Sequence, residues 1–286
     1  MVMSNKSIVA LGLPASGKTT FLAALWHLLT NEKVNGHLSL AKLEAGEAAH
    51  LRSIASRWLQ AKNQDRTFHS GNKTVKLSLK PASGEIFELT FPDIAGEAFA
   101  QMWEMRECPS DVAEALQTNG VLLFIHADKI RVPGWIADDL AQSQDLGVVI
   151  GGDPTPWKPQ SSPTQVQLVD ILQCLQLPPL YVGPRRLAVI LSAWDKVEND
   201  GVSPERFLKL NLPLLYQYLE GGLGEGWKMR VFGVSAQGAD YDREGGEPNA
   251  DAERMREIEV PSHRIRVVAK DAESHDLTEP VYWLLG

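Results

Sequence analysis

Cysteine is scarce in this sequence, which contains only Cys108 and Cys174 among its 286 residues. The two cysteines lie far apart and show none of the close spacings that bind zinc. These features exclude a disulfide scaffold and a cysteine-rich metal site. We expect reduced thiols that pack like small apolar residues, as in cytosolic proteins.

Long apolar runs are also missing. No stretch approaches the roughly 20 apolar residues that a membrane-spanning helix needs. The amino terminus lacks the apolar segment behind a basic start that marks a signal peptide. We therefore expect a soluble, cytoplasmic protein with no membrane span.

Positive charge is in deficit, because 28 Lys and Arg residues face 36 Asp and Glu residues and give a formal net charge of −8. General binding to nucleic acid or to anionic membranes needs a basic surface, so we expect neither. The hydrophobic content of 44% is ordinary for a globular protein. The length fits one domain, residues 1–286, that carries insertions.

The sequence does contain one complete phosphate-binding motif. Residues 12–19 read GLPASGKT and match the P-loop pattern G-x-x-x-x-G-K-[ST] in full. An apolar strand at 8–11 precedes the motif and a helical run at 20–29 follows it, which is the setting the motif requires. The glycines let backbone N–H groups face phosphate oxygens, Lys18 reaches the outer phosphates, and the Thr19 hydroxyl holds magnesium. The predicted nucleotide-binding residues here are Gly12, Pro14, Ala15, Ser16, Gly17, Lys18, Thr19 and Thr20.

The rest of the hydrophobic pattern alternates strands and helices. Alternating residues at 75–79 and 86–91, joined by a turn, predict a β-hairpin. Continuous apolar runs at 120–127, 186–191 and 229–234 predict parallel strands that are covered on both faces. The order of elements predicts an α/β P-loop NTPase fold, a three-layer sandwich whose mostly parallel sheet has one antiparallel hairpin edge.

Helices are predicted over 42–62, 164–175, 205–219 and 277–285. Ser162 and Ser203, each followed by proline, are predicted helix caps, and Pro213 is expected to kink its helix. The segment 129–160 has no clear period and is interpreted as a surface insertion. The polar, acidic segment 240–256 is interpreted as a mobile loop.

A second motif follows the predicted hairpin, where residues 93–97 read DIAGE. Asp93 lies at the end of a strand, from which its carboxylate can reach the magnesium through water. Gly96 leaves a backbone N–H free to approach the γ-phosphate, and Glu97 comes next. A D-x-x-G pattern is short, and its position after a strand and downstream of a P-loop gives it weight.

Two further motifs point to guanine. Asp195, in the SAWDK sequence at 192–196, can accept hydrogen bonds from the guanine N1–H and amine, which adenine cannot donate. Backbone N–H groups around Ser235 and Ala236 can meet the guanine carbonyl oxygen. All these motifs follow strands, where ligands bind in such sheets. Asp195, Lys196, Ser235 and Ala236 therefore extend the predicted nucleotide-binding set.

The four motifs, in this order, resemble the Ras-like, translation-factor-related (TRAFAC) class of P-loop GTPases. More narrowly, DIAGE, SAWDK and the closing EPVYWLL at 279–285 resemble the bacterial double-GTPase family of conflict and defence systems. The resemblance leaves out insertions at about 31–71, an extended switch region, and at about 129–185. It implies GTP or GDP with Mg²⁺ as ligands, catalytic roles for Lys18, Thr67, Gly96 and Glu97, and magnesium ligation by Thr19, Asp93 and Thr67.

The sequence departs from this family pattern in two places. The guanine motif normally reads [NT]-K-x-D, and Ser192 and Ala193 replace its first two residues, so only Asp195 carries over. Either Trp194 or Lys196 shields the base, or Trp194 is an ordinary packing residue. Glu97 stands where glutamine often orients the attacking water. Because a carboxylate cannot donate a hydrogen bond and adds negative charge, we expect slow intrinsic hydrolysis.

The switch threonine is predicted to be Thr67, with Thr74 as the alternative. The neighbouring Arg66 is either an arginine finger supplied in cis or a solvated loop charge, and we favour the second interpretation. His69 and His126 are expected to be structural.

Three functions remain open from the sequence. The leading one is a magnesium-dependent GTPase that acts as a molecular switch through 63–73 and 93–111, with a protein effector or activating partner. The second is a nucleotide-binding interaction module that does not hydrolyse its ligand. The third, an ATP-using P-loop enzyme, is disfavoured because the sequence has no arginine-rich lid and no transporter signature.

Overall fold

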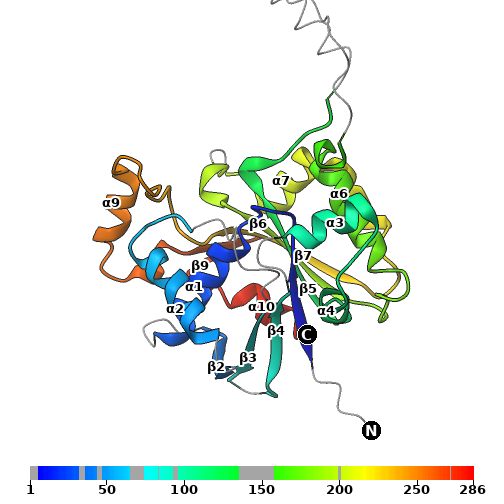
Figure 1. The fold of residues 1–286 in the computed structure, drawn as a ribbon, viewed down its shortest axis with the longest axis horizontal. Coiled ribbons are helices and arrows are strands. Elements are labelled where there is room, and N and C mark those ends of the chain that lie inside the picture. The colour runs from blue at the N-terminus through cyan, green and yellow to red at the C-terminus, as the bar shows by residue number, and fades with distance from the viewer. Residues whose placement is uncertain are drawn as a thin grey trace, which may run out of the picture.

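The computed structural model describes residues 6–31, 36–43, 47–64, 74–82, 84–92, 96–134, 158–198, 201–270 and 272–286. Within these residues, one mixed sheet has the strand order β2-β3-β4-β1-β5-β6-β7-β8-β9. Helices cover both of its faces (Figure 1). The predicted α/β three-layer sandwich is confirmed.

The centre of the sheet is parallel. It consists of β4 (Phe87–Phe91), β1 (Ser7–Leu11), β5 (Gly120–His126), β6 (Arg186–Ser192) and β7 (Lys228–Ser235). The sequences of β1, β5 and β6 are nearly continuous apolar runs, because both faces of these strands are covered. In β1, Ile8 and Ala10 pack into one core cluster, whereas Val9 and Leu11 pack into the other.

Both ends of the sheet are antiparallel. β3 (Val75–Pro81) pairs with β4 in the predicted hairpin, and β2 (Leu38–Leu43) pairs with β3 beyond it. At the other end, β8 (Arg266–Ala269) pairs with β7, and β9 (Ala272–Ser274) pairs with β8. The sheet thus has more antiparallel strands than the single hairpin edge that we predicted.

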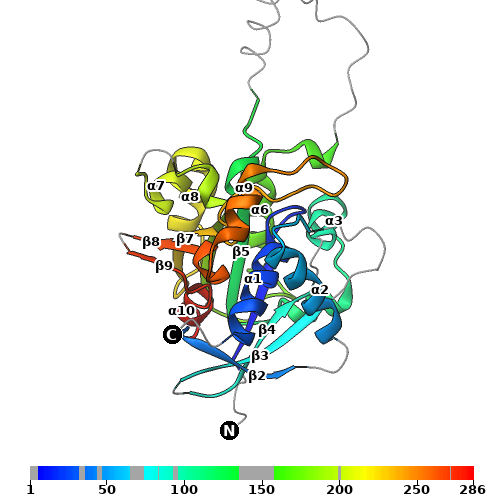
Figure 2. The ribbon, with the colours of Figure 1, turned by 90° about the vertical axis from the view of Figure 1, so that its left-hand side faces the viewer.

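The helices divide between the two faces (Figures 1 and 2). One face carries α1 (Lys18–Thr30), α2 (Glu47–Leu59), α9 (Ala250–Glu257) and α10 (Glu279–Trp283). The other carries α3 (Glu97–Met105), α4 (Ser110–Ala115), α6 (Thr164–Cys174), α7 (Pro204–Asn211) and α8 (Pro213–Gly221).

Several predicted boundaries were wrong. The helix predicted over 42–62 begins only at Glu47, because residues 38–43 form β2. Pro213 separates two helices instead of kinking one. The mobile loop predicted over 240–256 ends in α9, whose first turn is capped by the side chain of Asn249.

The two predicted caps had different outcomes. The Ser203 hydroxyl accepts a hydrogen bond from Arg206 N, so this cap is confirmed. Ser162 does not cap α6, whose N-cap position is Pro163. Much of the predicted insertion at 129–160 lies outside the described residues.

Three other features bear on the sequence-based expectations. Cys108 and Cys174 are free thiols, and burial above all raises the pKa of Cys108 to about 11. Within the described ranges, no helix has both the length and the apolar character to cross a bilayer. At the amino-terminal end of β1, the Lys6 ammonium donates a 2.6 Å hydrogen bond to the carbonyl of Leu285.

Candidate functional site

The P-loop connects β1 to α1, as the motif predicts. A Cβ added to Gly12 would lie 2.7 Å from the carbonyl oxygen of Phe124, so no side chain fits there. Gly17 adopts φ +94°, and its added Cβ would lie 2.7 Å from Ser192 Oγ. Among the described residues, no side chain caps the amino terminus of α1. That end of the helix therefore keeps the partial positive charge that suits an anion.

Lys18 is buried against the P-loop, with only 2% of its surface exposed. Its Nζ donates hydrogen bonds to Gly12 O at 2.6 Å, to Leu13 O at 3.2 Å and to Ser16 Oγ at 3.3 Å. The ammonium group is thus held by the same loop that would cradle a phosphate.

The amino terminus of α3 rests against the P-loop. Gly96, with φ +87°, is so close that an added Cβ would lie 2.7 Å from Lys18 Nζ and 2.8 Å from Gly12 O. Glu97 begins α3, and its side chain is exposed. Asp93, Thr67, Arg66 and His69 lie outside the described residues. The alternative switch residue, Thr74, donates to the carbonyl of Pro92 at 3.0 Å.

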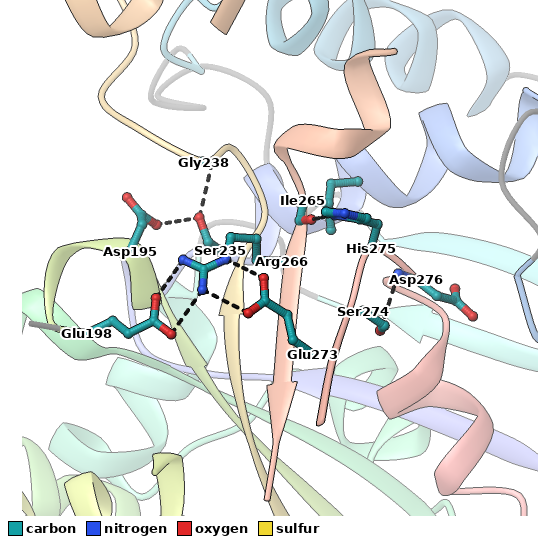
Figure 3. A network of polar contacts seen from close by, with 10 residues as sticks. All are labelled: Asp195, Glu198, Ser235, Gly238, Ile265, Arg266, Glu273, Ser274, His275 and Asp276. Carbon is teal, nitrogen blue, oxygen red and sulfur yellow. Dashed lines mark hydrogen bonds and ion pairs between the residues drawn. The ribbon is translucent and has the colours of Figure 1, made fainter. Parts of the chain in front are cut away.

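The end of β6 is joined to both the P-loop and the end of β7. Ser192 Oγ donates to Ser16 O at 2.8 Å. The Ser235 hydroxyl donates to Asp195 Oδ1 at 2.5 Å and accepts from Gly238 N at 3.0 Å (Figure 3). Because these bonds fix one carboxylate oxygen, they set the direction of the Asp195 side chain.

The structure decides between the two interpretations of Trp194. Its side chain is 1% exposed and packs edge-on against Phe207, with 5.4 Å between the ring centroids. Trp194 is therefore a core residue, as the packing interpretation held, and the alternative that it shields a base is contradicted by its burial. Lys196 forms ion pairs with Asp240 at 2.6 Å and with Asp128 at 4.0 Å, and chiefly the first raises its pKa.

A cluster of three charged residues lies next to this part of the site, on β8, on β9 and after Asp195. Arg266 lies opposite Ser235 in the β7–β8 ladder. Its guanidinium bonds both carboxylate oxygens of Glu198, at 2.5 and 3.0 Å, and both of Glu273, at 2.7 and 3.0 Å (Figure 3). The cluster connects the segment after Asp195 to the β8–β9 hairpin.

One cleft of about 1190 Å³ collects these elements. That volume is larger than the roughly 300 to 1,000 Å³ of ordinary small-ligand pockets. Of the predicted site residues, the following line it: Pro14, Ala15, Ser16, Gly17, Lys18, Thr19, Thr20, Glu97, Asp195, Lys196 and Ala236. Gly12, Gly96 and Ser235 support the lining residues without lining the cleft themselves.

One wall of the cleft could not be predicted from the sequence. It is formed by Asn63 and Gln64, which follow α2, and by residues within 240–249, which lead into α9. Asn63 N donates to Asp242 O at 2.8 Å, and Asp242 N donates to Ala61 O at 2.9 Å. Both segments are polar and have no period, so nothing in the sequence indicates that they pair.

His126, at the end of β5, also lines the cleft. Burial above all, and then the nearby Lys129, lower its pKa to about 4. Its Nδ1 is buried and has no hydrogen-bond partner among the described residues. The imidazole is therefore neutral near pH 7. No group of three or more His, Cys, Asp or Glu residues that could hold a metal occurs in the described part of the chain.

Comparison with protein families gives one match over nearly the whole chain. A sequence model of the family described as "Double-GTPase 1" matches residues 9–284. No curated protein matched the chain significantly.

Solved structures with a similar arrangement include GTPase-like proteins. The S. cerevisiae Ski7 GTPase-like domain bound to GTP is 12% identical and has a TM-score of 0.42, with 91% of this chain and 50% of that chain covered. A Chaetomium thermophilum signal recognition particle receptor complex, SRb-GTP/SRX, is 13% identical with a TM-score of 0.39, covering 89% and 96%. A complex of SsGBP and GDP is 15% identical with a TM-score of 0.35, covering 82% and 46%. The chain thus spans about half of the SsGBP and Ski7 chains, and we rest no functional assignment on these similarities.

Proposed function

The chain belongs to the Double-GTPase 1 family, and from that premise we propose that it binds GTP with magnesium, hydrolyses it to GDP and acts as a molecular switch. The observation that carries the proposal is the shared cleft, which the P-loop residues and Asp195 line together. The proposed site for triphosphate and the proposed site for guanine would thus share one cavity.

The P-loop would bind the phosphates. Lys18 already lies against P-loop carbonyl oxygens, so a short movement of a flexible side chain would bring its ammonium group to the outer phosphates. The uncapped end of α1 would add its N–H groups. Developing negative charge on the γ-phosphate would be stabilised by groups that are already in place.

Thr19 fits magnesium, because this residue carries a hydroxyl and lines the cleft directly after Lys18. Magnesium needs few protein ligands, since it keeps waters and takes phosphate oxygens. Asp93 and Thr67 are the other proposed ligands, and both lie outside the described residues. When bound, the ion would neutralise charge on the β- and γ-phosphates.

Asp195 would select the base. Its carboxylate, held by Ser235 on one oxygen, would accept hydrogen bonds from the N1–H and amine of guanine. Adenine would leave these acceptors unpaired, and such a mismatch is strongly penalised.

Glu97 would set the rate. It stands at the start of α3, directly after Gly96, whose backbone lies against Lys18. As an acceptor it could orient a water for attack on the γ-phosphate, and its negative charge would oppose a charged transition state. We therefore propose slow intrinsic hydrolysis and a protein partner that completes the site. A role in a bacterial conflict system is part of the proposal through the family resemblance alone.

The same residue favours a second candidate function, a nucleotide-binding module that does not hydrolyse GTP. In that case Glu97 would leave the site inactive, and the cleft would serve only to fix a conformation that a partner protein recognises.

Two measurements separate these functions. Titration of fluorescently labelled GTP and ATP tests the base, and a preference for ATP would contradict guanine recognition. Phosphate release by the wild type, Lys18→Ala and Lys209→Ala tests hydrolysis. Lys209 contacts Tyr216 on the far helical layer and serves as a matched lysine control. If the wild type releases phosphate no faster than Lys18→Ala, the non-hydrolysing module is favoured.

A further inference from the structure

The carboxyl-terminal end of α2 is bonded to the wall of the cleft. Trp58 is completely buried, and its indole N–H donates a 2.8 Å hydrogen bond to the carbonyl oxygen of Ala236. Ala236 follows β7 and lines the cleft. This bond joins two segments that are 178 residues apart in the sequence.

The indole is fixed from three sides. Its ring lies 5.1 Å from the ring of His27 in α1, and 5.4 Å from the guanidinium carbon of Arg264. Arg264, itself 3% exposed, donates from Nη1 to the carbonyl oxygens of Trp58 and Leu59, each at 3.2 Å. Burial, and then Arg264, lower the pKa of His27. The His27 ring is therefore uncharged near neutral pH, and Arg264 is the cation that contacts the indole. Trp58 therefore has one available orientation.

The segment 235–238 is held at two points. The Ser235 hydroxyl, bonded to Asp195 and to Gly238 N, fixes its first residue (Figure 3). The bond from Trp58 fixes the carbonyl of Ala236. A trans peptide places its C=O and N–H on opposite sides, so holding this carbonyl also sets the direction of the N–H of Gln237. Ala236 and Gln237 both line the cleft.

We propose that Trp58 is a positioning residue for base recognition. By anchoring Ala236 O, it aims the backbone N–H group of Gln237 at the carbonyl oxygen of a guanine base. Asp195 would accept hydrogen bonds from the donors of the same base, the N1–H and the amine. The inference rests on the proposed function and adds a residue of α2, in the extended switch region, that positions the backbone after β7 for base selection.

The test compares ligands that differ at one atom or group of the base. GDP has an oxygen at C6, 6-thio-GDP has a poorly accepting sulfur there, and IDP keeps the oxygen but lacks the amine that Asp195 would bind. Calorimetric titration of each ligand gives two ratios of Kd. The ratio of 6-thio-GDP to GDP reports the N–H contact, and the ratio of IDP to GDP reports Asp195.

We expect Trp58→Phe to weaken GDP binding about threefold to tenfold and to lower the 6-thio-GDP ratio by a similar factor, the scale of one lost hydrogen bond. The IDP ratio should stay unchanged. Trp103→Phe is the matched control, because Trp103 N–H donates to Pro159 O at 2.9 Å between α3 and the segment before α6. It should change neither ratio.

Loss of ring volume is separated from loss of the hydrogen bond by Trp58→3-benzothienylalanine, in which sulfur replaces N–H at almost the same size. This variant should reproduce the change in the 6-thio-GDP ratio. An unchanged ratio in it, or equal weakening of all three ligands, would overturn the inference while leaving guanine binding intact. A wild type that binds GDP no better than ADP would overturn the proposed base recognition and this inference together.

Discussion

The Ser192 hydroxyl donates a buried 2.8 Å hydrogen bond to the carbonyl oxygen of Ser16. Ser192 opens the predicted guanine motif at the end of β6, and Ser16 lies inside the P-loop. The proposed base site and phosphate site are therefore bonded directly to each other, so a change at either one should be felt at the other.

Removal of this bond should weaken both stability and ligand binding. In Ser192→Ala the carbonyl of Ser16 keeps its burial and loses this donor, which costs about 1 to 3 kcal/mol. We expect the free energy of unfolding in urea to fall by about that amount and GDP affinity to fall about threefold or more. Ser39→Ala is the control, since Ser39 makes only an exposed 3.4 Å bond to Lys80 O on an edge strand. Equal effects of the two substitutions would contradict the prediction.

Gly96→Ala should impair catalysis by a steric route. The new methyl group would lie 2.7 Å from Lys18 Nζ, so either α3 or the lysine must move. Misplacement of this order can cost about tenfold to a hundredfold in rate, measured as single-turnover phosphate release. Gly183→Ala is matched in backbone strain, with φ +95°, but its Cβ would meet nothing within 4 Å. It should lose about 1 to 2 kcal/mol of stability and keep the wild-type rate. If both variants slow the reaction alike, backbone strain and not the clash is responsible.

Asp195→Asn should change the preferred base. An asparagine keeps one acceptor and gains a donor, which suits the N1–H and C2 carbonyl of xanthine. We expect GDP affinity to fall about a hundredfold or more, with xanthosine diphosphate becoming the better ligand. Competition against a labelled nucleotide measures both. Asp251→Asn, in the first turn of α9, where the carboxylate pairs with Arg254, should leave both affinities unchanged. A GDP-preferring Asp195→Asn variant would show that Asp195 does not read the base.

Stability should depend on pH through His126. Its pKa in the folded chain, about 4, lies below the ordinary value of 6.5. Between these values the unfolded chain binds a proton that the folded chain does not, so the free energy of unfolding should fall as pH drops from about 6.5 to about 4 and level off below. Because the side chain is only partly buried, we expect about 1 to 2 kcal/mol over this window. His126→Gln should remove this contribution. Urea denaturation at several pH values measures the free energy of unfolding of both proteins, and an equal loss in wild type and variant between pH 6.5 and 4 would contradict the prediction.

Much of the centre of the fold could be predicted, because its signals are local. The P-loop needs small residues at Gly12 and Gly17 for steric reasons that any such loop shares. The apolar runs of β5 and β6 reflect burial on both faces. Family membership could be predicted from the same motifs. The roles of individual site residues remain predictions.

The parts that were missed depend on contacts distant in sequence or on broken periodicity. In β2 a register shift between Leu40 and Lys42 interrupts the alternation that marks a strand. In α9 only Ala252 is buried, so no apolar stripe marks a helix, and the Asn249 cap is its main signal. Trp194 was ambiguous because its partner, Phe207, comes from a different element. The polar wall at 240–249 takes shape only by pairing with the end of α2.

The hydrogen bond between Lys6 and Leu285 makes this chain a candidate for circular permutation. Lys6 directly precedes β1, so this bond lies at the amino-terminal ends of the parallel strands, away from the carboxyl ends that carry the cleft. A short linker could join the two bonded residues, and new ends could be opened at Gly183, which has open space around its Cβ position. Loop positions between packed elements tolerate new termini best. The order in which the P-loop and the guanine motif leave the ribosome could then be reversed without moving either one in the folded molecule.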